Sequence, residues 1–157
     1  MSVDFTPLEP FFKKCYAEFH KFLLTAGKKL VSEIAKHPDV KKVDYMENGY
    51  GINYTYENFV ESVTDSLKGI IKSGDIKNDK FTSIGVGTGL ANFYTDKDPK
   101  ELIAYGLKLG DQYNKQTPKH FYINCTEQHS KSQGTFLDAF AGYDIDIRSP
   151  EFDYLRK

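Results

Sequence analysis

The segment Phe81–Leu90, which reads FTSIGVGTGL, constrains the fold of this chain more than any other stretch. Gly85, Gly87 and Gly89 occupy every second position directly after a short apolar run. Because glycine has no β-carbon, its backbone can turn sharply or touch a neighbouring group. In open α/β folds, ligands bind at the carboxyl edge of the sheet, where parallel strands end. The pattern therefore predicts a strand over Phe81–Val86 that ends in a glycine-rich turn, which either binds a ligand or is only a turn between elements.

Apolar residues at helical spacing predict three amphipathic helices. The first spans Pro10–His37 and stops before a proline, which cannot continue a helix. The second spans Tyr56–Ser73 and is followed by a glycine, which suits the left-handed closing position. The third begins with an N-cap at Asp98, followed by a proline at the first helical position, and continues to Pro118.

Several strands are predicted from alternating or β-branched residues. Two of them flank Asn48-Gly49, a pair that supplies the positive φ angles of a type I′ hairpin turn. The others are His120–Thr126, Thr135–Ala141 and Tyr143–Arg148. Because strands joined through helices are typical of layered α/β proteins, we predict a short, Rossmann-like, mostly parallel sheet with flanking helices. An α+β fold is the alternative.

The size and charge of the chain exclude several classes of function. Its 157 residues fit a single domain, in which residues 1–55 form a helix and hairpin element and residues 56–157 form the α/β core. The net charge of −1, from 21 basic and 22 acidic residues, leaves no basic excess for nucleic acid. No apolar run is long enough for a membrane span, and no secretory leader is recognisable, so we expect a cytoplasmic protein.

Cysteines and histidines suggest no metal site. Cys15 and Cys125 are too few and too far apart for a disulfide framework or a zinc knuckle, so we expect two buried, reduced thiols. The four histidines lack the spacing of metal ligands. A short sheet with an unpaired edge could be completed by a second copy, so we also expect a homodimer.

The glycine segment and the residues before it resemble a known family. The motif SIGVGTG over Ser83–Gly89 looks like the first motif of class I S-adenosylmethionine-dependent methyltransferases, a strand followed by G-x-G-x-G. The longer stretch Leu67–Gly89 is similar to the histamine N-methyltransferase family, in which an L-x-G-I-I helix end leads through a G-D turn to a strand reading S-I-G. The resemblance implies a shortened, methyltransferase-like protein that binds S-adenosylmethionine and acts on a small amine or similar metabolite.

The resemblance also implies roles for individual residues. The residues that would contact the cofactor are Gly85, Gly87 and Gly89, through their backbone, and Glu127, through the ribose hydroxyls. Tyr56 and Glu57 lie where that family gathers contacts to the substrate amine. Methyl transfer would then depend on holding the amine lone pair in line with the sulfonium methyl, in a site that excludes water.

Other interpretations remain open. The 12 Phe and 11 Tyr residues could form a surface that binds a partner protein, which makes a non-enzymatic interaction domain the alternative. A small α+β enzyme acting on a nucleotide-like metabolite is a further one. Cys125 and His129 share a strand face but lie roughly 13 Å apart, too far for a catalytic pair. Asp144 and Asp146 also share a face, which is more simply interpreted as solvated than as a cation clamp.

Overall fold

The computed structural model describes residues 3–46, 54–78 and 81–157. The helical elements are η1 (Thr6–Leu8), α1 (Glu9–Phe22), the π-helical η2 (Leu23–Gly27), α2 (Lys28–Ala35), α3 (Tyr56–Lys72), α4 (Lys100–Lys115) and η4 (Pro150–Arg156). The strands are β1 (Lys42–Tyr45), β2 (Ser83–Tyr94), β3 (Phe121–Ser130) and β4 (Gly134–Asp146). All three predicted helices are confirmed, the first as the continuous series α1, η2 and α2.

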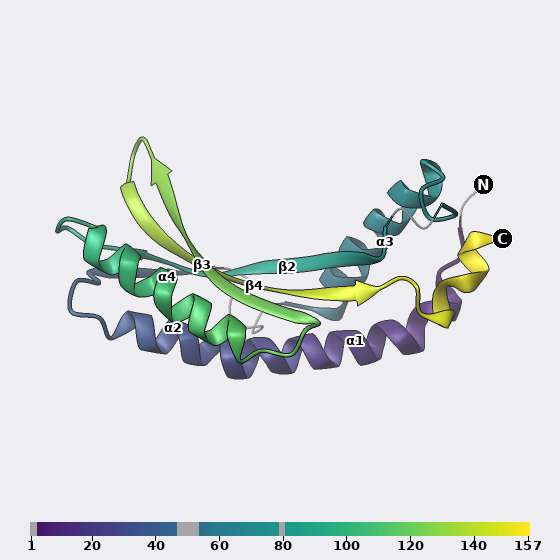
Figure 1. Ribbon diagram of the computed structural model, residues 1–157, viewed down its shortest axis with the longest axis horizontal. Coiled ribbons are helices and arrows are strands. Elements are labelled where there is room, and N and C mark those ends of the chain that lie inside the picture. The colour runs from purple at the N-terminus through teal and green to yellow at the C-terminus, as the bar shows by residue number, and fades with distance from the viewer. Residues whose placement is uncertain (1–2, 47–53, 79–80) are drawn as a thin grey trace.

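The strands form one antiparallel sheet in the order β1-β2-β4-β3. Figure 1 shows α1 and α2 as a long rod below the sheet, α4 on the same side, and α3 crossing behind β2. We call the sheet face that packs on the helices the inner face and the opposite one the outer face. The β3–β4 turn curls upward, away from the helices. The protein is therefore a two-layer α+β fold.

The prediction of a Rossmann-like, mostly parallel sheet is wrong. β3, which contains most of the predicted strand His120–Thr126, pairs with β4, and every strand pair is antiparallel. A short turn that ends at Gly134, with φ of +73°, joins β3 to β4. Such a connection is too short for a parallel crossover, so it dictates an antiparallel pair. Residues Thr135–Ala141 and Tyr143–Arg148, predicted as two strands, lie mostly in the single long strand β4.

The glycines do not form the predicted turn, because β2 continues through them to Tyr94. Ile84 and Val86 are buried on the inner face, whereas Gly85 and Gly87 are exposed on the outer face. This alternation is that of an antiparallel strand with one face on the core and one face toward solvent. The glycine pattern thus marks one face of a strand.

The predicted N-terminal hairpin is described only in part. Its turn, Asn48-Gly49, lies outside the described residues. Its first arm contains β1, which pairs with the end of β2 so that Lys42 lies opposite Tyr94 and Tyr45 opposite Ala91.

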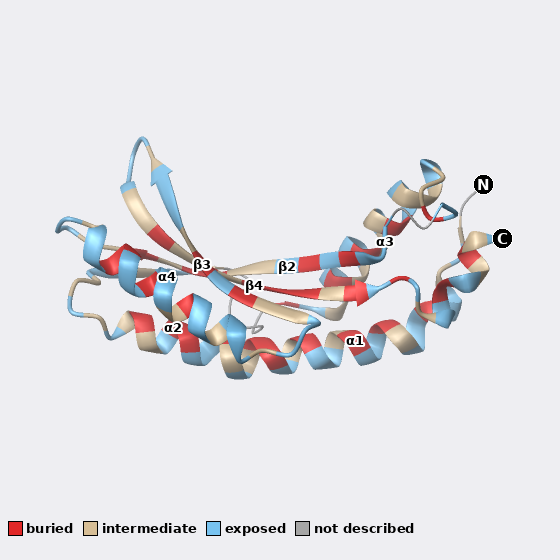
Figure 2. Ribbon diagram, in the orientation of Figure 1, coloured by how far each residue is buried: buried red, intermediate tan, exposed pale blue. Residues whose placement is uncertain are grey.

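Apolar side chains from the helices fill the inner face of the sheet, as the buried stripes of Figure 2 show. The buried residues of α1 recur once per helical turn and are Phe12, Cys15, Phe19 and Phe22. The ring of Phe19 lies 6.1 Å from that of Tyr143 in β4, and the ring of Phe12 lies 6.5 Å from that of Phe59 in α3. α1 therefore joins α3 to the end of the sheet.

α4 lies unusually close to β3 because a glycine faces the strand. A β-carbon at Gly110 would lie 2.9 Å from the backbone nitrogen of Cys125. The backbone N–H of Ile123 donates a hydrogen bond of 3.1 Å to the side-chain oxygen of Asn114. This N–H is therefore not free to pair with a second copy of the chain. The homodimer stays a prediction that this part of the β3 edge does not support.

Candidate functional site

The glycine row lies on the outer face, where side chains of the same molecule cover part of it. A β-carbon at Gly142 of β4 would lie 1.9 Å from Cζ of Tyr122, so the ring of Tyr122 rests on that glycine. The hydroxyl of Tyr122 comes within 3.4 Å of the β-carbon position at Gly87. Met46 covers Gly89 at 3.0 Å. These glycines make room for the protein's own side chains.

Glu127, the predicted ribose contact, does not lie beside the glycines. It pairs with Leu137, whereas Gly89 pairs with Phe140, three positions along β4. Strand alternation also places Glu127 on the inner side of β3, opposite to the glycine face. Its carboxylate lies 3.1 Å from Nε2 of His129.

Tyr56 and Glu57, the predicted substrate contacts, open α3 in the helical layer. Thr55 caps this helix, since its hydroxyl accepts a 3.1 Å hydrogen bond from the N–H of Asn58. Tyr56 packs on Tyr16 of α1 with ring centroids 5.7 Å apart, and burial raises the pKa of Tyr56. Glu57 is exposed in the first turn, where the helix dipole favours an acid. These residues and the glycines belong to different layers of the fold.

The positions of these residues do not fit the adenosyl site that the resemblance implies. Such a site needs bare backbone at the end of a parallel strand and an acid on the next strand. Here Tyr122 rests on the sheet at Gly142, and the neighbouring strand β4 runs antiparallel to β2. S-adenosylmethionine binding stays a prediction from the sequence.

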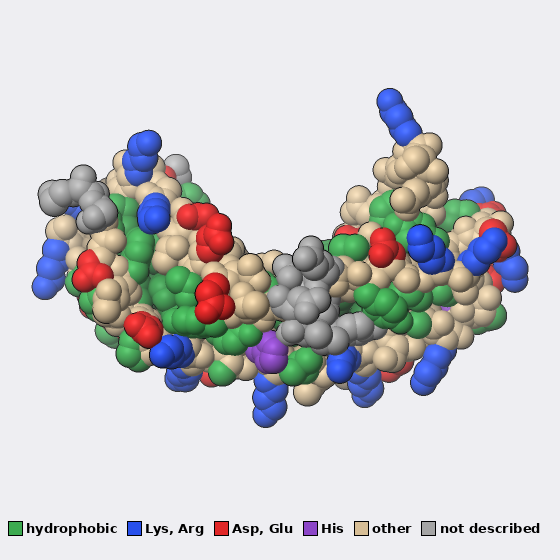
Figure 3. Space-filling view, turned by 180° about the vertical axis from the view of Figure 1, so that it is seen from behind, with side chains coloured by type: hydrophobic (Ala, Val, Ile, Leu, Met, Phe, Trp, Pro, Cys, Tyr) green, Lys and Arg blue, Asp and Glu red, His purple; other side chains and the backbone are tan. Residues whose placement is uncertain are grey.

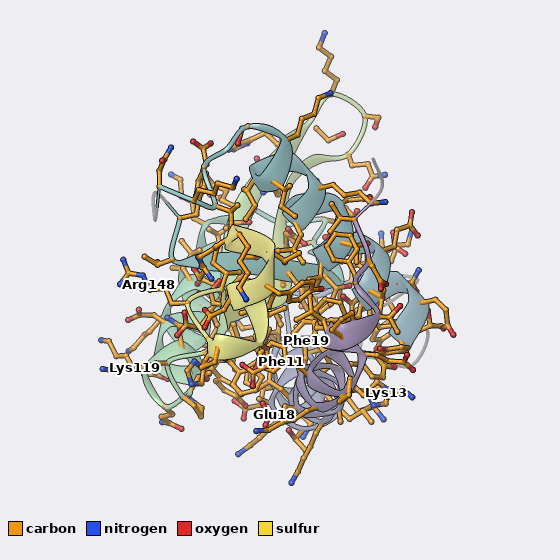
Figure 4. All side chains as sticks on the ribbon, turned by 90° about the vertical axis from the view of Figure 1, so that its right-hand side faces the viewer. Phe11, Lys13, Glu18, Phe19, Lys119 and Arg148 are labelled. Carbon is orange, nitrogen blue, oxygen red and sulfur yellow. The ribbon has the colours of Figure 1, made fainter. Side chains whose placement is uncertain are left out.

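A cavity of about 270 Å³ lies beside the part of β4 that extends past the first residue of β3 and pairs only with β2. The lining residues that carry a charge or an aromatic ring include Phe11, Lys14, Glu18, Tyr143, Asp144 and Asp146. Figure 4 looks onto this end of the molecule and shows Phe11 and Phe19 beside α1, with Lys119 and Arg148 at the left margin. The site thus forms between the first helix and the last strand.

Tyr143 connects the two walls of this cavity. Its hydroxyl donates a 3.2 Å hydrogen bond to Oε2 of Glu18 and is also hydrogen-bonded to the thiol of Cys15. Burial, followed by the hydrogen bond with Cys15, raises the pKa of Tyr143, and burial raises the pKa of Cys15. Both groups therefore stay protonated near neutral pH. Tyr143 acts as a donor that orients the carboxylate of Glu18, and Cys15 is a poor nucleophile.

The charges around the cavity favour a cation. Glu18 and Lys14 of α1 line it together with Asp144 and Asp146 of β4, and the carboxylate of Asp144 lies on the outer side of the strand, 3.3 Å from the β-carbon position at Gly85. Phe11 and Tyr143 add aromatic rings, whose faces attract cations. The volume is below the range of roughly 300–1,000 Å³ that is usual for drug-sized ligands, so the cavity suits a small molecule.

The outer face of the sheet carries a polar row between two rows that contain aromatic rings. The polar row crosses all four strands through Asp44, Asn92, Asp138 and Thr126. On one side of it, the rings of Tyr94 and Phe136 lie 5.0 Å apart. On the other side, Phe140 pairs with Gly89 of β2. All three rings are half-buried, so this face is less polar than an ordinary solvated sheet face.

We expect Asp138→Asn to stabilise the protein near neutral pH. Burial raises the pKa of Asp138, so the folded state binds a proton more tightly than the unfolded state. Stability therefore falls as the pH rises from the ordinary aspartate value of 3.8 through the raised pKa, and an asparagine removes this loss. Urea denaturation of the variant and the wild type at pH values below and above this window measures the difference. An advantage that did not grow with pH would contradict the assignment.

Other reactive groups offer no additional site. Burial raises the pKa of the Cys125 thiol to about 12, which excludes a thiolate nucleophile at neutral pH. Cys15 and Cys125 are both free and buried, as expected. Within residues 3–46, 54–78 and 81–157, no three His, Cys, Asp or Glu side chains converge to hold a metal ion. Over the same part of the chain, no helix has the length and apolar character needed to cross a bilayer.

Sequence reasoning singled out Asp144 and Asp146 but missed their neighbours Glu18 and Tyr143. The hydrogen bond between Glu18 and Tyr143 joins residues 125 positions apart. Local periodicity carries no signal for such a pair, because it reports only which face of an element is buried. Glu18 itself looks like an ordinary residue on the polar face of a helix.

No protein-family model, curated protein or solved structure matches this chain, so its candidate function depends on the site alone.

Proposed function

We propose that this protein binds a small organic cation, such as an amine, in the cavity between α1 and β4. The observation that carries the proposal is the carboxylate of Glu18, which Tyr143 holds at a cavity that Phe11 also lines. Carboxylates neutralise a cation and accept its hydrogen bonds, and aromatic faces add a further attraction. We propose that this binding takes place in the cytoplasm.

The proposal is for binding without a covalent step. The thiol of Cys15 and the hydroxyl of Tyr143 both have raised pKa values and remain protonated near neutral pH, so neither supplies an anionic nucleophile. The bond from Tyr143 instead fixes the carboxylate of Glu18 before the ligand arrives, which reduces the entropy lost on binding. A small-amine ligand agrees with the substrate class that the methyltransferase resemblance implies, whereas methyl transfer has no support in this geometry.

Isothermal titration with phenylethylamine, putrescine and tetramethylammonium tests the proposal. We expect at least one of them to bind, and we expect Glu18→Gln to weaken that binding by about tenfold, since one charge-assisted hydrogen bond contributes roughly 1.5–3 kcal/mol. The matched control is Glu61→Gln, which makes the same change at an exposed position of α3. Absence of binding by all three cations at millimolar concentration, or equal affinities of the two variants, would overturn the proposal.

S-adenosylmethionine and S-adenosylhomocysteine belong in the same titration, because their binding is the prediction made from the sequence. S-adenosylmethionine carries a sulfonium as well as an amine and is larger than the cavity suits. If it binds at the glycines, Gly87→Ala should weaken it and Glu18→Gln should not. The opposite pattern would place it in the cation cavity. If neither substitution weakens the binding of S-adenosylmethionine, this ligand occupies neither of the two sites.

A further inference from the structure

The outer face of the sheet has features that the cation cavity does not use. Figure 3 shows that the molecule is hollowed along its upper side, between two raised ends. In Figure 1 these ends are the β3–β4 turn and the C-terminal end of α3, and the strands cross the floor between them. Gly85 and Gly87 expose main chain on this floor. The hollow therefore has a sheet face as its floor, which the side chains of Tyr122 and Met46 cover only in part.

The centre of this face has the composition of a guanidinium site. Asp138 lies two residues from Phe136 and two residues from Phe140 on the same side of β4, so a phenyl ring stands on each side of the carboxylate along the strand. The neighbours of Asp138 across the sheet are Asn92 and Thr126, which add polar oxygen atoms. A planar cation placed here can pair with the carboxylate and stack on the flanking rings at the same time.

The charge of the outer face also favours a guanidinium ligand. Its acidic residues are Asp44, Asp138, Asp144 and Asp146, and its strands contribute one lysine, Lys42. The ammonium of Lys42 already lies over the ring of Tyr94, 5.7 Å from the centroid. The face is therefore acidic, and one of its aromatic rings already holds a cation. A basic ligand complements it in both respects.

We infer that this face binds an arginine-bearing segment of another protein, with a guanidinium seated on Asp138 between Phe136 and Phe140. Arginine suits the position better than lysine, because its planar group forms paired hydrogen bonds with a carboxylate and stacks on rings. A second copy of the chain is a poorer occupant. It brings only Arg148 and Arg156, and Arg156 already donates to the carbonyl oxygen of Ile147.

Fluorescence anisotropy with a short labelled peptide in which arginine alternates with glycine tests this inference. We expect the wild type to bind this peptide several-fold more tightly than its lysine counterpart. Asp138→Asn should weaken binding of the arginine peptide about tenfold, the size typical of a lost charge-assisted pair. Phe140→Leu should reduce the preference for arginine over lysine while keeping an apolar side chain at the position.

The matched control is Asp111→Asn, which removes the same charge from an exposed position of α4, in the helical layer. Its affinity for the peptide should equal that of the wild type. The inference fails if Asp138→Asn and Asp111→Asn lose equal affinity, if the peptide does not bind, or if sedimentation shows that a second copy covers the face. Neither Asp138 nor Phe140 lines the cation cavity, so this result is independent of the proposed amine binding.

Discussion

Alanine at Gly110 is expected to destabilise the protein by about 2 kcal/mol. The new β-carbon would lie 2.9 Å from the backbone nitrogen of Cys125, so α4 must move away from β3 to admit it. Overpacking of this kind costs about 1–3 kcal/mol, which exceeds the ~1 kcal/mol by which alanine favours a helix over glycine. Gly106→Ala should act similarly, because its β-carbon would lie 2.2 Å from Cδ2 of the buried Leu137.

The control for this experiment is Gly69→Ala, the same substitution in the last turn of α3. Gly69 is exposed, and nothing lies within 4 Å of its β-carbon position. Alanine there should stabilise the protein by about 0.5–1 kcal/mol, because it lowers the entropy lost by the backbone. Urea denaturation followed by circular dichroism measures all three variants. Equal effects of Gly110→Ala and Gly69→Ala would show that α4 does not depend on close contact with β3.

Alanine at Gly142 is expected to destabilise the protein by roughly 1–3 kcal/mol, because it displaces the ring of Tyr122 from the outer face. The β-carbon would lie 1.9 Å from Cζ of Tyr122. The ring shields the exposed backbone of a strand glycine, which is otherwise a weak point in a sheet. Gly87→Ala is the matched strand control, since its nearest contacts are ordinary ones of 3.4 Å, and it should leave stability almost unchanged.

A double-mutant cycle tests whether contact with Tyr122 causes the destabilisation by Gly142→Ala. In a Tyr122→Ala background, Gly142→Ala should cost much less than it does in the wild type, because the group that it displaces is gone. A full cost in both backgrounds would locate the strain in the strand itself. The same variants address the role of the glycines: if Gly87→Ala abolishes binding of an adenosyl ligand while the fold is intact, the glycine face is a ligand site after all.

The helices were predictable because their signals are local. The apolar stripe of α1, the cap of α3 at Thr55 and the aspartate-proline start of α4 all depend on residues within a few positions of one another. α4 begins at Lys100 with Pro99 at the N-cap position, one residue later than predicted, and the N–H of Lys100 donates a 3.1 Å hydrogen bond to the carboxylate of Asp98. Such short-range chemistry is the same in any tertiary context.

The positions of most strands were predicted correctly, but their arrangement in the sheet was predicted wrongly. The alternation of Ile84 and Val86 with Gly85 and Gly87 already indicated a strand with one buried face, yet we interpreted the glycines as a turn. Periodicity shows which residues share a face, but it does not determine the direction of the neighbouring strand. Whether a glycine accommodates a ligand or a side chain such as Tyr122 depends on residues far away in the chain.

The amino-acid sequence by itself determined the three helices, the position of most strands and the burial of both cysteines, because periodicity and capping act over a single turn or a pair of residues. The tertiary structure alone decided that the sheet is antiparallel and that Tyr122 rests on Gly142. It also brought Glu18 to Tyr143 across 125 residues. These features arise from contacts between distant segments, which depend on how whole layers pack and leave no trace in local spacing.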